Sequence, residues 1–390
     1  MISIYQNKLK SVSGLSEKFN LGTAERVHSF HKTFPGYQPT PLIELTNLSK
    51  TLNVNKIWLK DESKRFGLNA FKVLGASYAI AKIIFNKFGF NDEKLSYSIF
   101  RSPEIADKVK ELSFVTATDG NHGRGVAWTA QQIGCKAVVY MPKGTTQIRL
   151  ENIKSLGADV LIINGNYDDA VNLAKTNAEK FGWILVQDSS WEGYENIPMM
   201  IMQGYLTLMG EIFEQLKDEI PTHVFVQCGV GSLPAAVIGY FVEKYGKQKP
   251  VFSVVEPEDS GCMYESVSSG KIITIQNEMK TIMAGLACGT PSKLAFDLLI
   301  NYSDFFIKCS DEITIEGMKI LGSGKFGDPK IISGESGAVT TGLVYHLLLE
   351  DKYKEQLNLD SESKILLIST EGNTDPDMYN KILGNCIADS

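Results

Sequence analysis

The stretch Asp119-Gly120-Asn121-His122-Gly123 combines residue types that can do chemistry with a position that favours binding. It lies between a strand-like run, 114–118, and a helix-like run, 124–133. A loop between a parallel strand and its helix presents backbone N–H groups to a carboxylate or phosphate, and glycines allow close approach. An acidic residue is unexpected in an anion-binding loop, so Asp119 is a candidate for proton transfer. A helix-capping aspartate is the alternative.

Lys72 ends a second string, KDESKRFGLNAFK at 60–72, and precedes an apolar-periodic run to about Phe88. Asn69 is a favourable N-cap residue, which predicts that Lys72 lies in the first turn of the next helix. The helix dipole disfavours a cation there, so the neutral amine is expected to be favoured. Only a neutral amine attacks an aldehyde to form a Schiff base. A solvated surface lysine, the default among 39 Lys and Arg residues, is the alternative.

A glycine loop, Gly229-Val230-Gly231-Ser232, follows a strand-like run at 223–228 and opens a helix-like run. Consecutive N–H groups at a helix start form a nest for a phosphate. The dinucleotide pattern G-x-G-x-x-G is not met, because Pro234 stands at its third glycine position. The loop therefore favours a short phosphate arm over a pyrophosphate, with a plain glycine turn as the alternative.

Taken in order, these motifs and the Pro39-Thr40-Pro41-Leu42 stretch resemble the fold-type II pyridoxal-phosphate (PLP) enzymes, which include tryptophan synthase β and the serine/threonine dehydratases. The longer strings are most similar to the diaminopropionate ammonia-lyase family. They are KDESKRFGLNAFK (60–72), TDGNHGRGVAW (118–128), QDSSWEGY (187–194), TIMAGLACG (281–289), SGESGAV (333–339) and STEGNTD (369–375). The resemblance extends from about residue 24 to residue 375. One string alone is a family-level feature, but the ordered combination is specific.

The resemblance implies PLP as cofactor and gives the motifs roles in binding it. Lys72 would carry PLP as a Schiff base, and Asn121 would hydrogen-bond its phenolic oxygen. Thr370 would face the pyridine nitrogen, where a hydroxyl leaves the ring unprotonated. Ser369 is an alternative to Thr370, because the string differs from the Ser-Gly-Gly-Asn form of many relatives. The phosphate would bind to the backbone N–H groups of Gly229, Val230, Gly231 and Ser232.

The same resemblance places the substrate between two bases. Lys72 would act on one face of the cofactor and Asp119 on the other, so that D- and L-substrates both react. The substrate carboxylate would bind at Gly120 to Gly123, with His122 ordering the loop. Asp188, at the end of the strand-like run 183–188, would pair with the β-amino group and keep that leaving nitrogen protonated. A capping aspartate is the alternative for Asp188, and Glu335 is assigned no role.

The implied activity is α,β-elimination of 2,3-diaminopropionate to pyruvate and two ammonia molecules. A serine/threonine dehydratase or another fold-type II β-eliminating lyase is the nearest alternative. Dehydratases commonly carry serine at the position of Asp119, which argues against them. A catalytically silent PLP-binding protein would have less need of Lys72 and both acids, and Pro234 disfavours a nicotinamide-dependent oxidoreductase.

The composition limits which classes of partner and which compartment are expected. The 390 residues allow two domains, and 43% hydrophobic and 22% charged residues are ordinary for a globular protein. Net charge −6 without a basic run gives no footprint for nucleic acid, and no apolar stretch approaches the roughly 20 residues of a membrane span. The N-terminus lacks a signal-peptide core, which predicts a cytoplasmic protein. The resemblance implies a homodimer acting on a small amino acid.

The six cysteines show no metal-ligand spacing, so reduced thiols and no metal are expected. Cys262 and Cys288 flank a segment that resembles the family, and a redox link between them is a hypothesis that a free-thiol count would test.

Strand-helix alternation predicts an α/β fold of two domains, each a mostly parallel sheet flanked by helices, with a cleft between them. The expected larger domain comprises 1–90 and 197–390 and carries Lys72, the phosphate loop and Thr370. The smaller comprises 91–196, with Asp188 and the Asp119–Gly123 loop. Expected strands are 114–118, 136–141, 158–163, 183–188, 223–228, 250–256 and 365–370, and expected helices are 124–133, 145–156, 168–181, 197–217 and 234–245. The candidate residues follow strand ends, where such sheets bind ligands.

Overall fold

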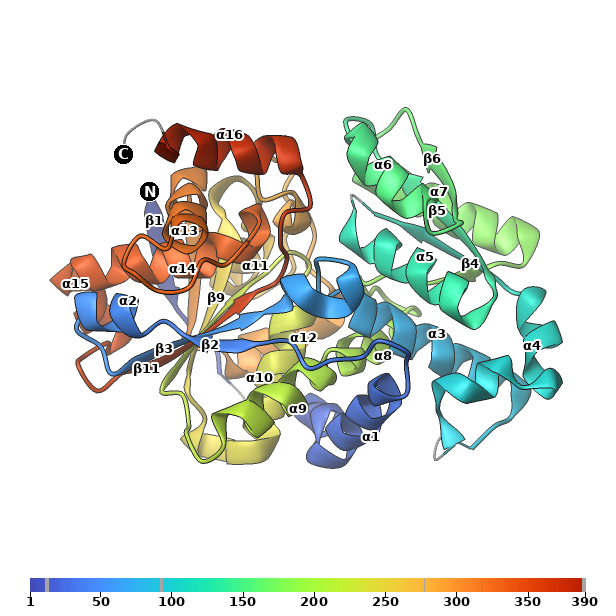
Figure 1. Cartoon of the computed structure of the whole chain (residues 1–390), viewed down its shortest axis with the longest axis horizontal. Coiled ribbons are helices and arrows are strands. Elements are labelled where there is room, and N and C mark those ends of the chain that lie inside the picture. The colour runs from blue at the N-terminus through green and yellow to red at the C-terminus, as the bar shows by residue number, and fades with distance from the viewer. Residues whose placement is uncertain (11–13, 92–93, 119, 277, 388–390) are drawn as a thin grey trace. The chain divides into compact units, whose positions relative to one another are not determined.

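The computed structural model describes residues 1–10, 14–91, 94–118, 120–276 and 278–387, so Asp119 lies outside the described residues. The chain divides into two compact units (Figure 1). The larger unit comprises Met1–Leu21, Pro39–Ala70 and Leu208–Ser390, and the smaller unit comprises Gly22–Gln38 and Phe71–Thr207. Within the described residues, no helix is long and apolar enough to cross a membrane.

The larger unit contains a seven-stranded sheet in the order β1-β10-β9-β8-β11-β3-β2. Its five inner strands, from β10 to β3, run parallel, and the edge strands β1 and β2 pair antiparallel with their neighbours. The inner strands are almost continuously buried, as expected where helices cover both faces. The strands are β1 (Ile2–Gln6), β2 (Leu42–Glu44), β3 (Lys56–Asp61), β8 (His223–Gln227), β9 (Val251–Pro257), β10 (Phe305–Cys309) and β11 (Lys364–Ser369).

Helices and short 3₁₀ turns surround this sheet and complete its core. The helices are α2 (Thr46–Thr51), α9 (Leu206–Leu216), α10 (Ser232–Tyr245), α11 (Cys262–Ser269), α12 (Lys293–Tyr302), α13 (Asp311–Ser323), α14 (Glu335–Leu349), α15 (Asp351–Leu357) and α16 (Pro376–Ile387). The 3₁₀ turns are η1 (Gly14–Phe19), η2 (Glu62–Gly67), η5 (Gly246–Gln248), η6 (Glu258–Ser260) and η7 (Ala284–Leu286).

The smaller unit contains a parallel four-stranded sheet in the order β6-β5-β4-β7. The strand-helix alternation expected from the sequence is confirmed here, and Gly134 and Gly182 end their helices with φ of 92° and 68°. The strands are β4 (Ser113–Ala117), β5 (Lys136–Met141), β6 (Asp159–Ile162) and β7 (Ile184–Leu185). The helices are α1 (Leu21–Lys32), α3 (Val73–Phe88), α4 (Pro103–Lys110), α5 (Asn121–Ile133), α6 (Gln147–Lys154), α7 (Tyr167–Phe181) and α8 (Asn196–Gly204), with the 3₁₀ turn η4 (Tyr97–Arg101).

The division into units differs from the expected domain boundaries at Gly22–Gln38, which contains most of α1, and at α3 and α8, all of which belong to the smaller unit. The backbones of α3 and α8 pack closely: a Cβ at Gly75 of α3 would lie 2.9 Å from Ile201 O, and one at Gly204 of α8 would lie 2.4 Å from Leu74 O. Lys72, at the start of α3, therefore groups with the smaller unit, whereas the sequence placed it in the larger domain.

Three local expectations are corrected. The single helix expected at 197–217 is broken at Tyr205 into α8 and α9. Asn69 does not cap α3: it has φ of 55°, and Lys72 itself is the N-cap residue. Strand β7 ends at Leu185, so Asp188 follows the strand by three residues instead of ending it.

Candidate active site

Lys72 and Asp188 form an ion pair in the smaller unit. Lys72 Nζ lies 2.5 Å from Asp188 Oδ2, and the Asp188 side chain is almost fully buried. Burial alone would raise the pKa of Asp188, but Lys72 and then His122 lower it to about 2. The expectation of a neutral lysine rested on the helix dipole alone and did not include this partner.

The loop at the carboxyl end of β4 leads into α5, which begins at Asn121. A Cβ at Gly123 would lie 2.3 Å from Thr118 Cγ2 and 2.8 Å from Val139 Cγ1, so the position requires glycine. His122 is buried and donates from Nε2 to Val186 O at 2.8 Å. Burial lowers the pKa of His122. The hydrogen bond ties α5 to the segment that leads to Asp188.

Gln187, which the sequence analysis did not single out, fixes the segment beside Asp188. Its Oε1 accepts from Ala117 N at 3.1 Å, and its Nε2 donates to Ala117 O at 3.1 Å and to the Tyr167 hydroxyl at 2.7 Å. The side chain thus replaces strand pairing at the end of β4, after β7 has stopped. The sequence feature that could have revealed it is a glutamine that ends the apolar run Ile-Leu-Val-Gln.

The loop Gly229–Ser232 in the larger unit is tightly packed. A Cβ at Gly229 would lie 3.1 Å from Cys288 Sγ and from Gly285 O, and Gly231 has φ of 104°. Helix α10 begins at Ser232, so its first N–H groups have no partner inside the helix. The Gly229–Ser232 loop therefore has a backbone conformation that favours glycine at the start of a helix, which suits the binding of a phosphate. Neither Cys262 nor Cys288 forms a disulfide, so the hypothesised redox link is not formed in this structure.

Ser369 and Thr370 differ in what their hydroxyl groups contact. The Ser369 hydroxyl, fully buried at the end of β11, donates to Ser333 Oγ at 2.7 Å. Thr370 Oγ1 instead accepts a hydrogen bond from Gln227 Nε2 at 3.0 Å. The contacts therefore favour Thr370 over Ser369 as the hydroxyl available to a ligand.

Main-chain contacts join the string that leads to Lys72 to the string that contains Thr370. Ala70 pairs with Glu371 in an antiparallel bridge, and Asn69 O accepts from Gly372 N at 2.9 Å. Glu371 Oε1 in turn accepts from Ser336 N at 3.0 Å, at the start of α14. Glu335, in the same first turn, is buried, but it remains without an assigned role.

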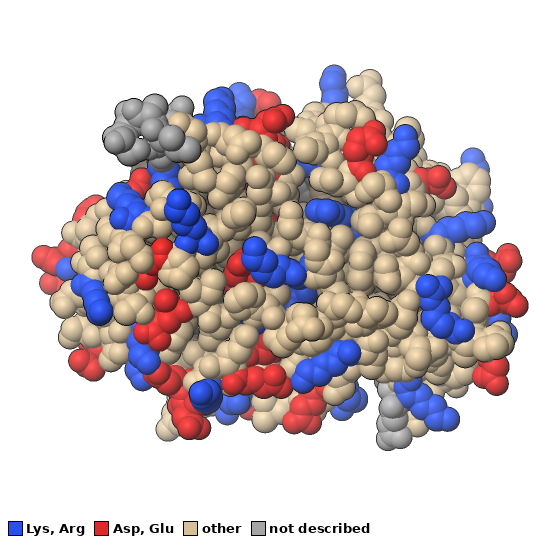
Figure 2. All heavy atoms as spheres, viewed as in Figure 1, with Lys and Arg blue, Asp and Glu red and all other residues tan. Residues whose placement is uncertain are grey.

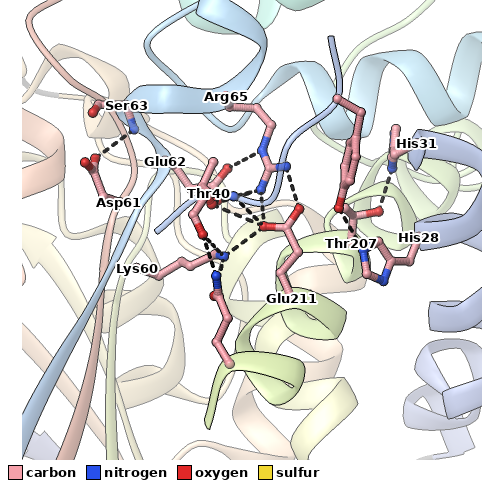
Figure 3. Close-up of polar contacts among 12 residues, drawn as sticks. His28, His31, Thr40, Lys60, Asp61, Glu62, Ser63, Arg65, Thr207 and Glu211 are labelled. Carbon is pink, nitrogen blue, oxygen red and sulfur yellow. Dashed lines mark hydrogen bonds and ion pairs between the residues drawn. The ribbon is translucent and has the colours of Figure 1, made fainter. Parts of the chain in front are cut away.

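A buried charge network supports the string 60–72, which ends at Lys72 (Figure 3). Arg65 donates from Nη1 to Glu211 Oε1 at 2.6 Å and from Nη2 to Glu211 Oε2 at 2.7 Å, and it also pairs with Glu62. Lys60 Nζ lies 2.8 Å from Glu211 Oε2, and Thr40 bonds to both glutamates. Burial works against these charges, but Arg65 and Lys60 keep the pKa of Glu211 below its usual range.

The residues present suit PLP. The Gly229–Ser232 loop leaves little room for a side chain at Gly229, so its backbone N–H groups suit a phosphate. The buried Thr370 hydroxyl has a proton to donate, so it suits a ring nitrogen. Lys72 supplies the amine that an aldehyde needs. Of the predicted residues, the structure brings Lys72, His122 and Asp188 together in the smaller unit, and it places Thr370 and the Gly229–Ser232 loop at neighbouring strand ends in the larger unit.

Three comparisons with known proteins agree with this chemistry. The family model described as pyridoxal-phosphate dependent enzyme matches residues 33–371. Diaminopropionate ammonia-lyase of Salmonella typhimurium is 48% identical over 375 residues, which cover 94% of this chain and 93% of that protein.

Solved structures of the diaminopropionate ammonia lyase from Escherichia coli are also similar. The complex with an aminoacrylate-PLP azomethine reaction intermediate has a TM-score of 0.91 at 43% identity, covering 99% of this chain and 97% of that chain. The complex with D-serine has a TM-score of 0.91 at 42% identity, with the same coverage. The chain therefore belongs to the family of pyridoxal-phosphate-dependent enzymes and, within it, to the group of the diaminopropionate ammonia-lyases.

Proposed function

We propose that this chain is a PLP-dependent lyase that converts D- and L-2,3-diaminopropionate and water into pyruvate and two ammonia molecules. The observation that carries the proposal is the buried Lys72–Asp188 pair, which joins the lysine needed for PLP to a carboxylate suited to a substrate ammonium. The similarity to diaminopropionate ammonia-lyases over 94% of the chain supports the same substrate. A serine or threonine substrate has no β-ammonium for Asp188 to bind.

The cofactor contacts come from four places in the chain. Lys72 would hold PLP through its amine, and Asn121 would donate to the phenolic oxygen. The backbone N–H groups of Gly229, Val230, Gly231 and Ser232 would bind the phosphate, and the Thr370 hydroxyl would contact the pyridine nitrogen. PLP, when bound, withdraws electrons from the substrate Cα and so makes the α-proton removable.

Two bases would handle the α-proton of the two enantiomers. Lys72 Nζ accepts the proton of one enantiomer, and the Asp119 carboxylate accepts that of the other from the opposite face. The N–H groups from Gly120 to Gly123 hold the substrate carboxylate, which keeps the Cα–H directed at its base. His122, hydrogen-bonded to Val186 O, keeps this loop in place.

Asp188 would hold the β-ammonium of the substrate. In the structure its carboxylate pairs with Lys72, and it becomes available when the Lys72 nitrogen is engaged by PLP. The β-ammonium then replaces the Lys72 ammonium as the opposite charge beside Asp188, so the carboxylate stays ionised and stabilises the β-ammonium instead of protonating it. The nitrogen then leaves as neutral ammonia, and water converts the released three-carbon enamine to pyruvate and the second ammonia.

The proposal is tested by pyruvate release from purified protein given D- and L-diaminopropionate, with D- and L-serine and threonine alongside, while the visible spectrum is recorded. Turnover of both diaminopropionate enantiomers with absorbance from lysine-bound PLP is expected. Lys72→Ala should lose both activities and that absorbance. Preference for serine or threonine would overturn the substrate, and a protein that gains no absorbance after PLP is added would overturn the cofactor.

The compartment and the assembly are parts of the same proposal: a homodimer in the cytoplasm. The described cysteines, Cys135, Cys228, Cys262, Cys288 and Cys309, form no disulfide, which suits a reducing compartment. Figure 2 shows acidic and basic side chains interspersed over the visible face, which suits a small-molecule enzyme better than a nucleic-acid-binding protein. The dimer rests on the family resemblance, and sedimentation equilibrium would test it.

A further inference from the structure

Gln227, the last residue of β8, lies where β8 and β11 stop pairing. The two strands pair in register from His223 with Ile365 to Phe225 with Leu367. Beyond that point, Gln227 Nε2 donates to Ile368 O at 2.9 Å, and it also donates to Ser336 O at 2.9 Å in the first turn of α14. The side-chain amide thus joins three elements at the carboxyl edge of the sheet, next to the Gly229–Ser232 loop.

These contacts fix the orientation of the Gln227 amide. If the group were rotated by a half turn, Oε1 would face the carbonyl oxygens of Ser336 and Ile368, and three acceptors would repel one another. Nε2 must therefore face this side. Thr370 Oγ1, 3.0 Å away, is the third oxygen close to the same nitrogen, and Gly337 O lies farther away at 3.4 Å, so the two amide protons are shared among four acceptors.

The direction of the hydrogen bond decides what the Thr370 hydroxyl can do next. An amide nitrogen has no lone pair to accept a proton, so Thr370 Oγ1 is the acceptor and keeps its own proton. No acceptor for this proton occurs among the residues that the structure describes. Thr370 is buried, and a buried hydroxyl proton without an acceptor is costly. A ligand with a lone pair would satisfy it.

We propose that Gln227 is a positioning residue for the cofactor: by donating to Thr370 Oγ1, it directs the hydroxyl proton of Thr370 at the pyridine nitrogen of PLP. This inference rests on the proposed function. A donor hydroxyl leaves the ring nitrogen without a proton of its own, so the ring is a weaker electron sink, which suits prompt loss of a β-substituent. A purely structural glutamine would instead act only by holding Ser336 and Ile368.

The experiment combines Gln227→Met with Thr370→Val in a double-mutant cycle on the full-length protein. Methionine keeps the length of the side chain and removes the donor. The readouts are the dissociation constant of PLP, the pH dependence of the visible absorbance of bound PLP, and the urea unfolding midpoint. Gln227→Glu is a second variant, because its carboxyl oxygen accepts the Thr370 proton and withdraws it from the cofactor. Ser369→Ala is the matched control, because Ser369 is the residue next to Thr370 and its hydroxyl donates to Ser333 Oγ instead.

Gln227→Met should raise the dissociation constant of PLP about fivefold, the equivalent of one neutral hydrogen bond, and shift the pH dependence of absorbance. In the Thr370→Val background the same change should have no further effect on either readout. Ser369→Ala should change only the unfolding midpoint. The inference is overturned if Gln227→Met alters the midpoint alone, or if its effect on PLP binding is equally large without the Thr370 hydroxyl. A wild-type protein that binds no PLP would refute the proposed function and this inference with it.

Discussion

The Lys72 ammonium and the Asp188 carboxylate are held 2.5 Å apart in the smaller unit, although 116 residues separate them in the sequence. Because Asp188 is buried, the free energy of unfolding depends on whether its carboxyl group is ionised. The pKa of Asp188 is lowered from 3.8 to about 2, so its carboxylate is favoured in the folded state.

The first prediction concerns the pH dependence of this contribution in the PLP-free protein. A lowered folded pKa gives stability that is fully present above the unfolded pKa of 3.8 and is lost as the pH falls through the folded pKa of about 2. The shift corresponds to about 2 kcal/mol. The difference in unfolding free energy between wild type and Asp188→Asn, from urea titrations, should therefore shrink by about 2 kcal/mol between about pH 4 and pH 2. A difference that stays constant over this window would contradict the assignment.

The second prediction tests whether Asp188 acts on the leaving group. Asp188→Asn removes the charge that holds the β-ammonium, so kcat/KM for diaminopropionate should fall by about 100-fold, the equivalent of losing a hydrogen bond between charged groups of roughly 1.5–3 kcal/mol. A substrate with a β-chloro group loses chloride without a proton. For β-chloroalanine the same variant should therefore retain activity within about threefold, since no ammonium has to be held there. An equal loss for both substrates would show that Asp188 acts elsewhere, for example by orienting Lys72.

The third prediction concerns Asp119, which lies outside the described residues. Asp119→Asn removes one of the two opposed bases, so elimination from D-diaminopropionate should fall by about 100-fold or more, while the L-enantiomer should lose less than about threefold. Pyruvate release from each pure enantiomer gives the ratio. Equal losses on the two enantiomers would contradict the two-base arrangement.

The sequence predicts the α/β alternation well because strand and helix periodicities are local properties. Strands β4 and β5 and helix α7 appear where their apolar patterns place them, and β11 joins the sheet of β8 and β9 as expected. The break at Tyr205 was missed because the apolar pattern runs through 197–217, although Gly204, directly before the break, was a signal for it in the sequence.

The candidate site was harder to predict because its contacts are distant in the sequence. Local capping rules made Asn69 the N-cap of the next helix, but Asn69 O instead bonds to Gly372 N, 303 residues away, and its φ is positive. Gln187 and Gln227 both end apolar runs of the sequence with the dipeptide Val-Gln. A buried amide of this kind indicates a hydrogen-bonded link between separate elements. Its partners can be identified only in the structure, where neighbouring strands stop pairing.

The last prediction concerns the buried network of Arg65, Lys60 and Glu211. Glu211→Gln removes a charge that both cations contact, and among the described residues of this network it leaves Glu62 as the anion beside two buried cations. Removing one partner from a buried pair typically costs 3–5 kcal/mol, so about that loss of unfolding free energy is expected. Glu219→Gln is the matched control, because Glu219 also contacts two lysines, Lys56 and Lys364, but at the surface.

The control should lose less than about 1 kcal/mol, since solvent screens exposed pairs. The network also anchors the turn η2, in which Phe66 has φ of 48° and from which the chain continues to Lys72. Glu211→Gln should therefore also weaken PLP binding, whereas Glu219→Gln should not. Urea unfolding midpoints and PLP titrations of the two variants measure both effects. Equal destabilisation by the two variants would show that the buried charges are compensated by contacts other than Glu211.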